Sequence, residues 1–254
     1  MKKGWKIALS AILMMIWVGA SIIASQLVVG YTMLGILGSK TLAQPLPNAV
    51  YSALSYIIAM VLIIIVPPKL FAIYGKKRGK KIVSKNTRKS LGLTEWPTWT
   101  DIGLAPTGFL VYLLLAAGLT AVFSLFPWFN ASEAQDVGFS VYISGIDRAI
   151  AFLVLVVVAP IAEEIIFRGW LYDKLRGKFL EQCSNTTSMI VSMLLVSLLF
   201  GLIHMQWNVG VNVFAMSIVL CCLREITGTI YAGILMHMLK NGVAFYLLYV
   251  VGIS

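Results

Sequence analysis

The chain has few charged residues. Only 12% of its 254 residues are Asp, Glu, Lys or Arg, whereas 59% are hydrophobic. This balance excludes a water-soluble enzyme and predicts a polytopic membrane protein. The formal net charge of +10 does not indicate nucleic-acid binding, because the basic residues lie between apolar runs, where the positive-inside rule places them.

Several signatures of enzyme chemistry are also missing. The three cysteines, Cys183, Cys221 and Cys222, form neither a metal-ligand spacing nor a disulfide framework. The sequence contains no G-x-S-x-G motif of a serine hydrolase and no H-E-x-x-H helix of a zinc protease. It also has no internal repeat, which disfavours a transporter built from two related halves.

Apolar runs predict about seven transmembrane helices, most of them close to the roughly 20 residues that cross a bilayer. We expect them at residues 7–29, 48–66, 102–126, 148–170, 188–204, 209–223 and 229–250. The first run has a basic start like a signal peptide but is too long for one, so we interpret it as a retained helix. Thr100 or Asp101 is expected to cap the third span. The predicted fold is an all-α bundle of membrane helices.

Basic loops predict the orientation of this bundle. Residues 69–89 contain nine Lys or Arg and no acid. A cytoplasmic N-terminus puts this loop on the same side as residues 2–6, residues 174–178 and Arg224, in agreement with the positive-inside rule. We therefore expect a multi-pass protein of the cell membrane with its N-terminus in the cytoplasm.

Two adjacent carboxylates, Glu163 and Glu164, follow an almost unbroken apolar run over residues 149–159. Each charged side chain at a bilayer centre costs about 2.5–3.5 kcal/mol on insertion scales, so a purely structural span has no reason to carry them. Glu164 and Arg168 are four residues apart on one helix face and can form a pair. Glu163 is rotated by about 100° from Glu164, which makes it the freer acid and the better candidate for a general base.

The chain has only two histidines, His204 and His237, and both lie in apolar spans after the acids. His237 and Asn241 share a helix face and can point into one cavity. If the fourth and fifth spans form an antiparallel hairpin, Glu163 and His204 lie at a similar depth, because their midpoint falls in the predicted turn at residues 183–184. The polar residues of separate spans are thus expected to form one site.

These groups suit the hydrolysis of a peptide bond. A carboxylate and an imidazole, Glu163 and His204, can activate a water molecule. A second imidazole and an amide, His237 and Asn241, can donate hydrogen bonds to the oxyanion of a tetrahedral intermediate. As an alternative, Glu163, His204 and His237 would make the ligand set of a divalent metal such as zinc. We favour direct activation of water and keep metal assistance by a divalent ion such as zinc open.

Three motifs occur in order in successive helices: Glu163-Glu164-x-x-x-Arg168, Phe200-x-x-x-His204 and His237-x-x-x-Asn241. This ordered set resembles the CPBP family, which comprises CAAX-prenyl endopeptidases and bacteriocin-processing or immunity (Abi-type) intramembrane proteases. The resemblance covers roughly residues 91–249 and implies a helical membrane endopeptidase. It places the water-activating and oxyanion roles on the same four residues, and it gives Glu164 and Arg168 an electrostatic supporting role.

The resemblance also implies a division of the chain and a range of roles. Residues 1–90 would contribute two helices and the basic loop, and residues 91–254 the catalytic core. The expected substrate is a membrane-associated peptide or protein, such as a pheromone, a bacteriocin or a membrane signalling protein. The expected partners are this substrate and the lipid bilayer, with no nucleic acid. The sequence leaves the oligomeric state open.

Two other functions fit part of the pattern. A non-proteolytic immunity or scaffold protein could use the same helices to bind a partner's membrane segment. A small proton-coupled transporter could use Glu163 as its proton site. The two differ from a protease in that neither releases a cleavage product.

Overall fold

The computed structural model of the chain describes residues 2–42, 44–68, 88–94, 96–133 and 145–252. Within these ranges the regular structure is helical and contains no strand. Seven of the described helices are long and apolar enough to cross a membrane. The prediction of an all-α bundle with about seven transmembrane helices is therefore confirmed.

Each predicted span falls on an observed helix, and most helices extend a few residues beyond the prediction. The N-terminal part contains α1 (Lys2–Leu37), α2 (Ser39–Leu42), α3 (Pro45–Met60) and its continuation η1 (Val61–Ile65). One long helix follows α5 (Trp99–Phe123), and its parts are α6 (Gly145–Phe152), η2 (Leu153–Val158), α7 (Ala159–Glu164), η3 (Ile165–Tyr172) and α8 (Asp173–Leu180). The last helices are α9 (Asn185–Leu202), α10 (Trp207–Thr227), α11 (Tyr231–Tyr246) and η4 (Leu247–Val251).

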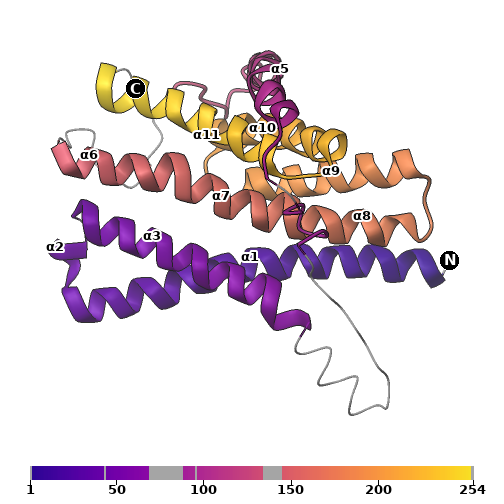
Figure 1. The fold of residues 1–254 in the computed structure, drawn as a ribbon, viewed down its shortest axis with the longest axis horizontal. Coiled ribbons are helices and arrows are strands. Elements are labelled where there is room, and N and C mark those ends of the chain that lie inside the picture. The colour runs from indigo at the N-terminus through magenta and orange to yellow at the C-terminus, as the bar shows by residue number, and fades with distance from the viewer. Residues whose placement is uncertain (1, 43, 69–87, 95, 134–144, 253–254) are drawn as a thin grey trace, which may run out of the picture.

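The long helix lies at the centre of the bundle. Figure 1 shows it between the α1–α3 pair on one side and α9, α10 and α11 on the other, with the two termini at opposite ends. In the most apolar window, half of the long helix and 56% of α10 are buried, against 22% for α1, α3, α5 and α11. The acidic pair therefore sits on one of the two most enclosed helices, while the outer helices turn most of their apolar surface outward.

The N-terminal helices pack directly on the helix that carries the acids. α3 contacts α6, η2 and α7, and α1 contacts η3 and α8. The division into residues 1–90 and 91–254 stays a prediction. These contacts make the first two helices a wall of the same bundle.

The start of α5 differs from the expected cap. Thr98 is the capping residue, and Asp101 occupies the third helical position of a capping box with it. Asp101 accepts a hydrogen bond from the Thr98 backbone nitrogen at 2.8 Å, and the Thr229 hydroxyl donates to it at 3.0 Å. The prediction of Thr100 or Asp101 was wrong by two or three residues, because the helix starts one turn before the apolar run does.

A short segment before α5 is held against the long helix. Gly92 has a positive φ of 71°, and its carbonyl accepts a hydrogen bond from Ile230 at 3.2 Å. Beside it, the Leu91 carbonyl oxygen lies 3.0 Å from where a Cβ would stand on Gly169. Only a glycine allows this close approach, so a side chain at position 169 would push the segment away from the helix of the acids.

Candidate active site

A wide turn in the long helix leaves one backbone carbonyl, that of Leu155, free to accept a hydrogen bond from another helix. At the end of η2, the backbone N–H of Ala159 bonds to the carbonyl of Val154, five residues back, rather than to Leu155. The next N–H in this wider pattern would belong to Pro160, which has none. The Leu155 carbonyl is therefore left without its helical donor, and Asn241 of α11 donates its amide Nδ2 to it at 2.8 Å.

Glu164 and Arg168 form the ion pair that their spacing predicts. The distance from Arg168 Nη1 to Glu164 Oε1 is 2.9 Å, and both side chains are fully buried. The guanidinium carbon of Arg168 also lies 4.7 Å from the centre of the Phe200 ring, within the range of a cation–π contact. Glu164 thus has a fixed, compensated charge, as a buried carboxylate requires.

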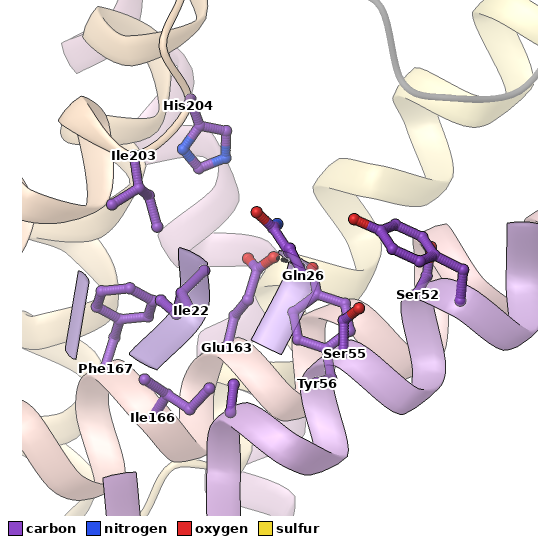
Figure 2. Close-up of a pocket in the computed structure, with 12 residues that line it drawn as sticks. Ile22, Gln26, Ser52, Ser55, Tyr56, Glu163, Ile166, Phe167, Ile203 and His204 are labelled. Atoms are coloured by element: carbon purple, nitrogen blue, oxygen red, sulfur yellow. Dashed lines mark hydrogen bonds between the residues drawn. The ribbon is translucent and has the colours of Figure 1, made fainter. Parts of the chain in front are cut away.

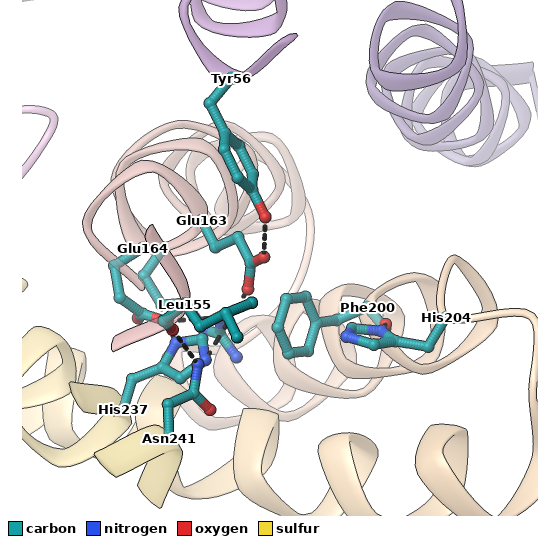
Figure 3. Close-up of polar contacts among 9 residues, drawn as sticks. Tyr56, Leu155, Glu163, Glu164, Phe200, His204, His237 and Asn241 are labelled. Carbon is teal, nitrogen blue, oxygen red and sulfur yellow. Dashed lines mark hydrogen bonds and ion pairs between the residues drawn. The ribbon is translucent and has the colours of Figure 1, made fainter. Parts of the chain in front are cut away.

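His237 lies between the two carboxylates (Figure 3). Its Nδ1 is 3.1 Å from Glu164 Oε1, and its Nε2 is 3.7 Å from Glu163 Oε2. A carboxylate only accepts hydrogen bonds, so Nδ1 must carry a proton in this arrangement. When Nε2 is protonated as well, His237 presents a second donor towards Glu163 and into the site.

Glu163 is the more open of the two acids, as the rotation between them predicts. Its side chain is 17% exposed, whereas that of Glu164 is fully buried. The hydroxyl of Tyr56, on α3, donates to Glu163 Oε1 at 2.6 Å. Sequence reasoning missed Tyr56, although polar Ser52 and Ser55 beside it in an apolar span were a signal that this face of α3 meets something polar.

Glu163 and His204 line one cavity of about 230 Å³ between the α1–α3 pair, the long helix and the end of α9. Figure 2 shows the two side chains on facing walls, with Gln26 of α1 beside the carboxylate of Glu163. We name this space the catalytic cavity. It places the two residues that were expected at a similar depth within reach of the same enclosed solvent.

His204 follows the last turn of α9, outside the candidate membrane spans at residues 185–202 and 207–227. Its Nδ1 lies 2.7 Å from the Phe200 carbonyl, which accepts, so the proton of the neutral ring sits on Nδ1. Burial lowers the pKa of His204 from its usual value, although the nearby Glu163 acts in the opposite direction. The neutral ring therefore keeps a lone pair on Nε2 that can accept a hydrogen bond from water.

The six predicted site residues gather around Glu163 but do not form a single ring. The aromatic ring of Phe200 lies between the two histidines, with its centre 5.1 Å from that of His204 and 6.2 Å from that of His237 (Figure 3). His204 shares the catalytic cavity with Glu163, whereas His237 bonds to Glu164, Asn241 bonds to the Leu155 carbonyl, and neither of them lines that cavity. Phe200 is thus the spacer that holds the two imidazoles apart.

Metal assistance, the alternative that the sequence leaves open, stays open here. Over the described ranges, no three His, Cys, Asp or Glu side chains come together as metal ligands would. The Nδ1 atoms of His204 and His237 bond to a carbonyl and a carboxylate respectively, which leaves Nε2 of each ring as the atom that would bind either water or a metal.

Gly233 of α11 is a further part of the site that the sequence did not reveal. A Cβ at this position would stand 3.1 Å from Glu164 Oε2. The absence of a side chain lets α11 approach the buried carboxylate closely enough for His237, one turn later, to bond with it. Gly242, on the same helix, has only an ordinary contact of 3.6 Å with Val156.

The Gly233→Ala variant should lose activity and stability. The added methyl group has to displace Glu164 or α11, and overpacking of this kind costs about 1–3 kcal/mol. The matched Gly242→Ala variant should be neutral or slightly more stable, because alanine favours a helix interior by about 1 kcal/mol over glycine. Thermal unfolding in detergent micelles and a cleavage assay compare the two, and equal behaviour would show that α11 does not depend on this close approach.

Residues 145–243 match the family model described as type II CAAX prenyl endopeptidase Rce1-like. The matched segment contains all six predicted site residues, and it confirms the resemblance to the CPBP family. The matched segment is thus similar to CAAX-type membrane endopeptidases. No curated protein and no solved structure matches the chain. Tyr56 lies outside the matched segment, so the family model does not account for its contact with Glu163.

Proposed function

We propose that this protein is an endopeptidase that cuts a peptide bond inside the bilayer or at its edge, using water activated by Glu163 and His204. The observation that carries the proposal is their common cavity, in which a carboxylate and the free Nε2 of a neutral imidazole share about 230 Å³. A carboxylate in such an enclosed space can take a proton from water, and the imidazole can orient the same water.

The proton path follows from these positions. Glu163 accepts a proton from the water as its oxygen attacks the carbonyl carbon of the scissile bond. His204 Nε2 accepts a hydrogen bond from the same water and fixes its direction. Glu163 then passes the proton to the leaving nitrogen, so that one residue serves first as general base and then as general acid.

The oxyanion of the intermediate would be stabilised from the other side of Glu163. In its doubly protonated form, His237 directs Nε2–H towards Glu163, at 3.7 Å between heavy atoms. Once Glu163 has taken the proton, its negative charge no longer competes for this donor, which becomes available to the oxyanion. Asn241 uses one amide hydrogen for the Leu155 carbonyl and keeps a second one. Donors placed in advance in this way stabilise the transition state without reorganisation.

Glu164 and Arg168 would act on the reaction through His237. The Glu164 carboxylate holds the proton on Nδ1 and sets the orientation of the ring. Arg168 compensates the charge of Glu164, so that the histidine faces a fixed negative group. Both are positioning residues in this proposal, because Glu164 acts by bonding to His237 Nδ1 and Arg168 acts by pairing with Glu164.

The cellular setting belongs to the same proposal. We place the protein in the cell membrane with its N-terminus, the basic loop of residues 69–89 and Arg224 on the cytoplasmic side. The substrate is a membrane-associated peptide or protein, and the reaction serves the processing of a peptide, pheromone, bacteriocin or membrane protein. The shared chemistry is a peptide bond presented at membrane depth.

Cleavage by purified protein in lipid vesicles tests the function. The probe is a membrane-spanning peptide of about 20 uncharged apolar residues with a central Gly-Ser-Gly interruption. Wild type should give two fragments by mass spectrometry, and His204→Gln should lower the rate about 10²-fold. Adding a chelator to both arms tests the metal alternative. Equal rates for wild type and His204→Gln would contradict the mechanism, and proton flux without fragments would favour the transporter.

A further inference from the structure

A second cavity lies next to the catalytic cavity, between the N-terminal helices. α1 and α3 cross and then diverge towards α2 (Figure 1), and Val18, Ala59 and Ile63 on these helices are buried. A space of about 620 Å³ lies between them on the α2 side. Its walls include Gln26 and Tyr51, and both of these side chains also line the catalytic cavity. We name this space the hairpin groove; it adjoins the catalytic cavity, which contains Glu163, at these two side chains.

The shared wall of the two spaces is polar, which is costly at membrane depth. Gln26, Asn48 and Tyr51 line the hairpin groove, and Ser52 and Ser55 continue the polar face into the catalytic cavity. The hydroxyl of Ser55 is particularly informative, since the residue is only 7% exposed. In the part of the chain that the structure describes, this hydroxyl has no hydrogen-bond partner. A buried hydroxyl without a partner costs about 1–3 kcal/mol, which a bound ligand would recover.

We propose that the hairpin groove binds the substrate as an extended peptide and leads its scissile bond to Glu163. A helical substrate keeps its carbonyl groups hydrogen-bonded and wrapped by side chains, so it has to unwind before water can attack. An unwound backbone at membrane depth needs polar partners in protein or water, because lipid offers none. The groove supplies such partners in line with the catalytic cavity. This inference rests on the proposed protease function.

The charge of the walls defines which peptides fit. Among the described residues that line the two spaces, Glu163 is the only one with a formal charge at neutral pH. The groove itself offers amide, hydroxyl and apolar surface. A charged substrate residue would enter without a partner at a depth where charges are expensive. The preferred peptide is therefore uncharged over the stretch that occupies the groove, with small or polar residues beside the scissile bond.

The glycines of α1 provide a matched pair for the kinetic test. Gly30 lines the hairpin groove, and a Cβ there would be 3.4 Å from the Tyr51 ring. Gly35 lies on the same helix with nothing within 4 Å of its Cβ position, and it lines neither space. Both replacements by leucine favour the helix, so both variants should fold. Only Gly30→Leu puts a bulky side chain into the proposed path of the peptide.

The Gly30→Leu variant should raise KM for the Gly-Ser-Gly peptide at least about tenfold and leave kcat nearly unchanged. The reason is that the groove binds the peptide equally in the ground state and the transition state. Gly35→Leu should retain wild-type values. Identical kinetics for the two leucine variants would overturn the groove as the route of the substrate.

Crosslinking separates this inference from the protease function. A photoreactive amino acid in place of Leu27, in the groove, is combined with the Glu163→Gln change so that no cleavage occurs. We expect it to label the Gly-Ser-Gly peptide, while the same amino acid in place of Leu114, which is 77% exposed on α5, labels lipid. Lipid as the only product at position 27 would overturn the inference. Peptide labelling together with no cleavage by wild type would retain the binding groove and reject the protease.

Discussion

Glu163→Gln should abolish peptide cleavage, by about 10³-fold or more, and leave the fold intact. The amide has nearly the same shape as the carboxylate and can still accept the hydrogen bond that Tyr56 donates to Oε1 at 2.6 Å. It cannot take a proton from water, and it offers no negative charge to His237. The loss should therefore appear in kcat, with little change in KM.

The same experiment needs a graded control and a check of folding. Tyr56→Phe removes one hydrogen bond to a charged group, which is worth about 1.5–3 kcal/mol, so a loss of about 10- to 100-fold is expected. Fragment release is measured by mass spectrometry, and thermal unfolding of each variant in micelles confirms the fold. Residual cleavage above a few per cent in Glu163→Gln would reassign the general base to another residue.

Arg168→Met should be the most destabilising single change in the site. It leaves the Glu164 carboxylate in the bundle without the cation that lies 2.9 Å from it, at a position where both side chains are fully buried. Breaking a buried pair by removing one partner costs about 3–5 kcal/mol, because the other charge stays in a low-dielectric interior. Methionine keeps most of the apolar volume, so the effect reports the charge rather than a cavity.

The double variant Arg168→Met, Glu164→Gln supplies the control. It removes both charges, and the glutamine oxygen can still accept a hydrogen bond from His237 Nδ1. Most of the lost stability should return, as seen in thermal unfolding in micelles, while activity stays low because His237 no longer faces a fixed anion. A single Arg168→Met variant as stable as wild type would show that Glu164 does not carry a charge in the folded protein.

The parts of the site that follow from spacing could be predicted from the sequence. Glu164 and Arg168 lie four residues apart on a helix and pair as expected. Glu163 and His204 are equidistant from the turn between two antiparallel helices, and they line one cavity. In each case local geometry along one helix or one hairpin determines the outcome. The catalytic roles of these residues stay predictions.

The contacts between helices distant in sequence could not be predicted in the same way. Tyr56 and Glu163 are separated by 107 positions, and nothing in the pattern of α3 says which helix its polar face meets. Asn241 was expected to share a cavity with His237, but its amide also bonds to Leu155. That contact depends on a carbonyl that has no helical donor, because of the wide turn and the missing N–H of Pro160. The hydropathy pattern of the sequence does not reveal such a turn.

η2 comprises the six residues from Leu153 to Val158. Its wide turn requires a fixed number of residues in this part of the long helix, whatever their side chains are. A wide turn behaves as a single-residue insertion that the helix has absorbed. Deleting one residue there would restore the ordinary helical repeat and remove the wide turn at which Ala159 bonds five residues back. The contact between Asn241 and the Leu155 carbonyl depends on this turn. Exchanges among leucine, valine and isoleucine in η2 should be tolerated by descendants of this protein, whereas a deletion of one codon should not.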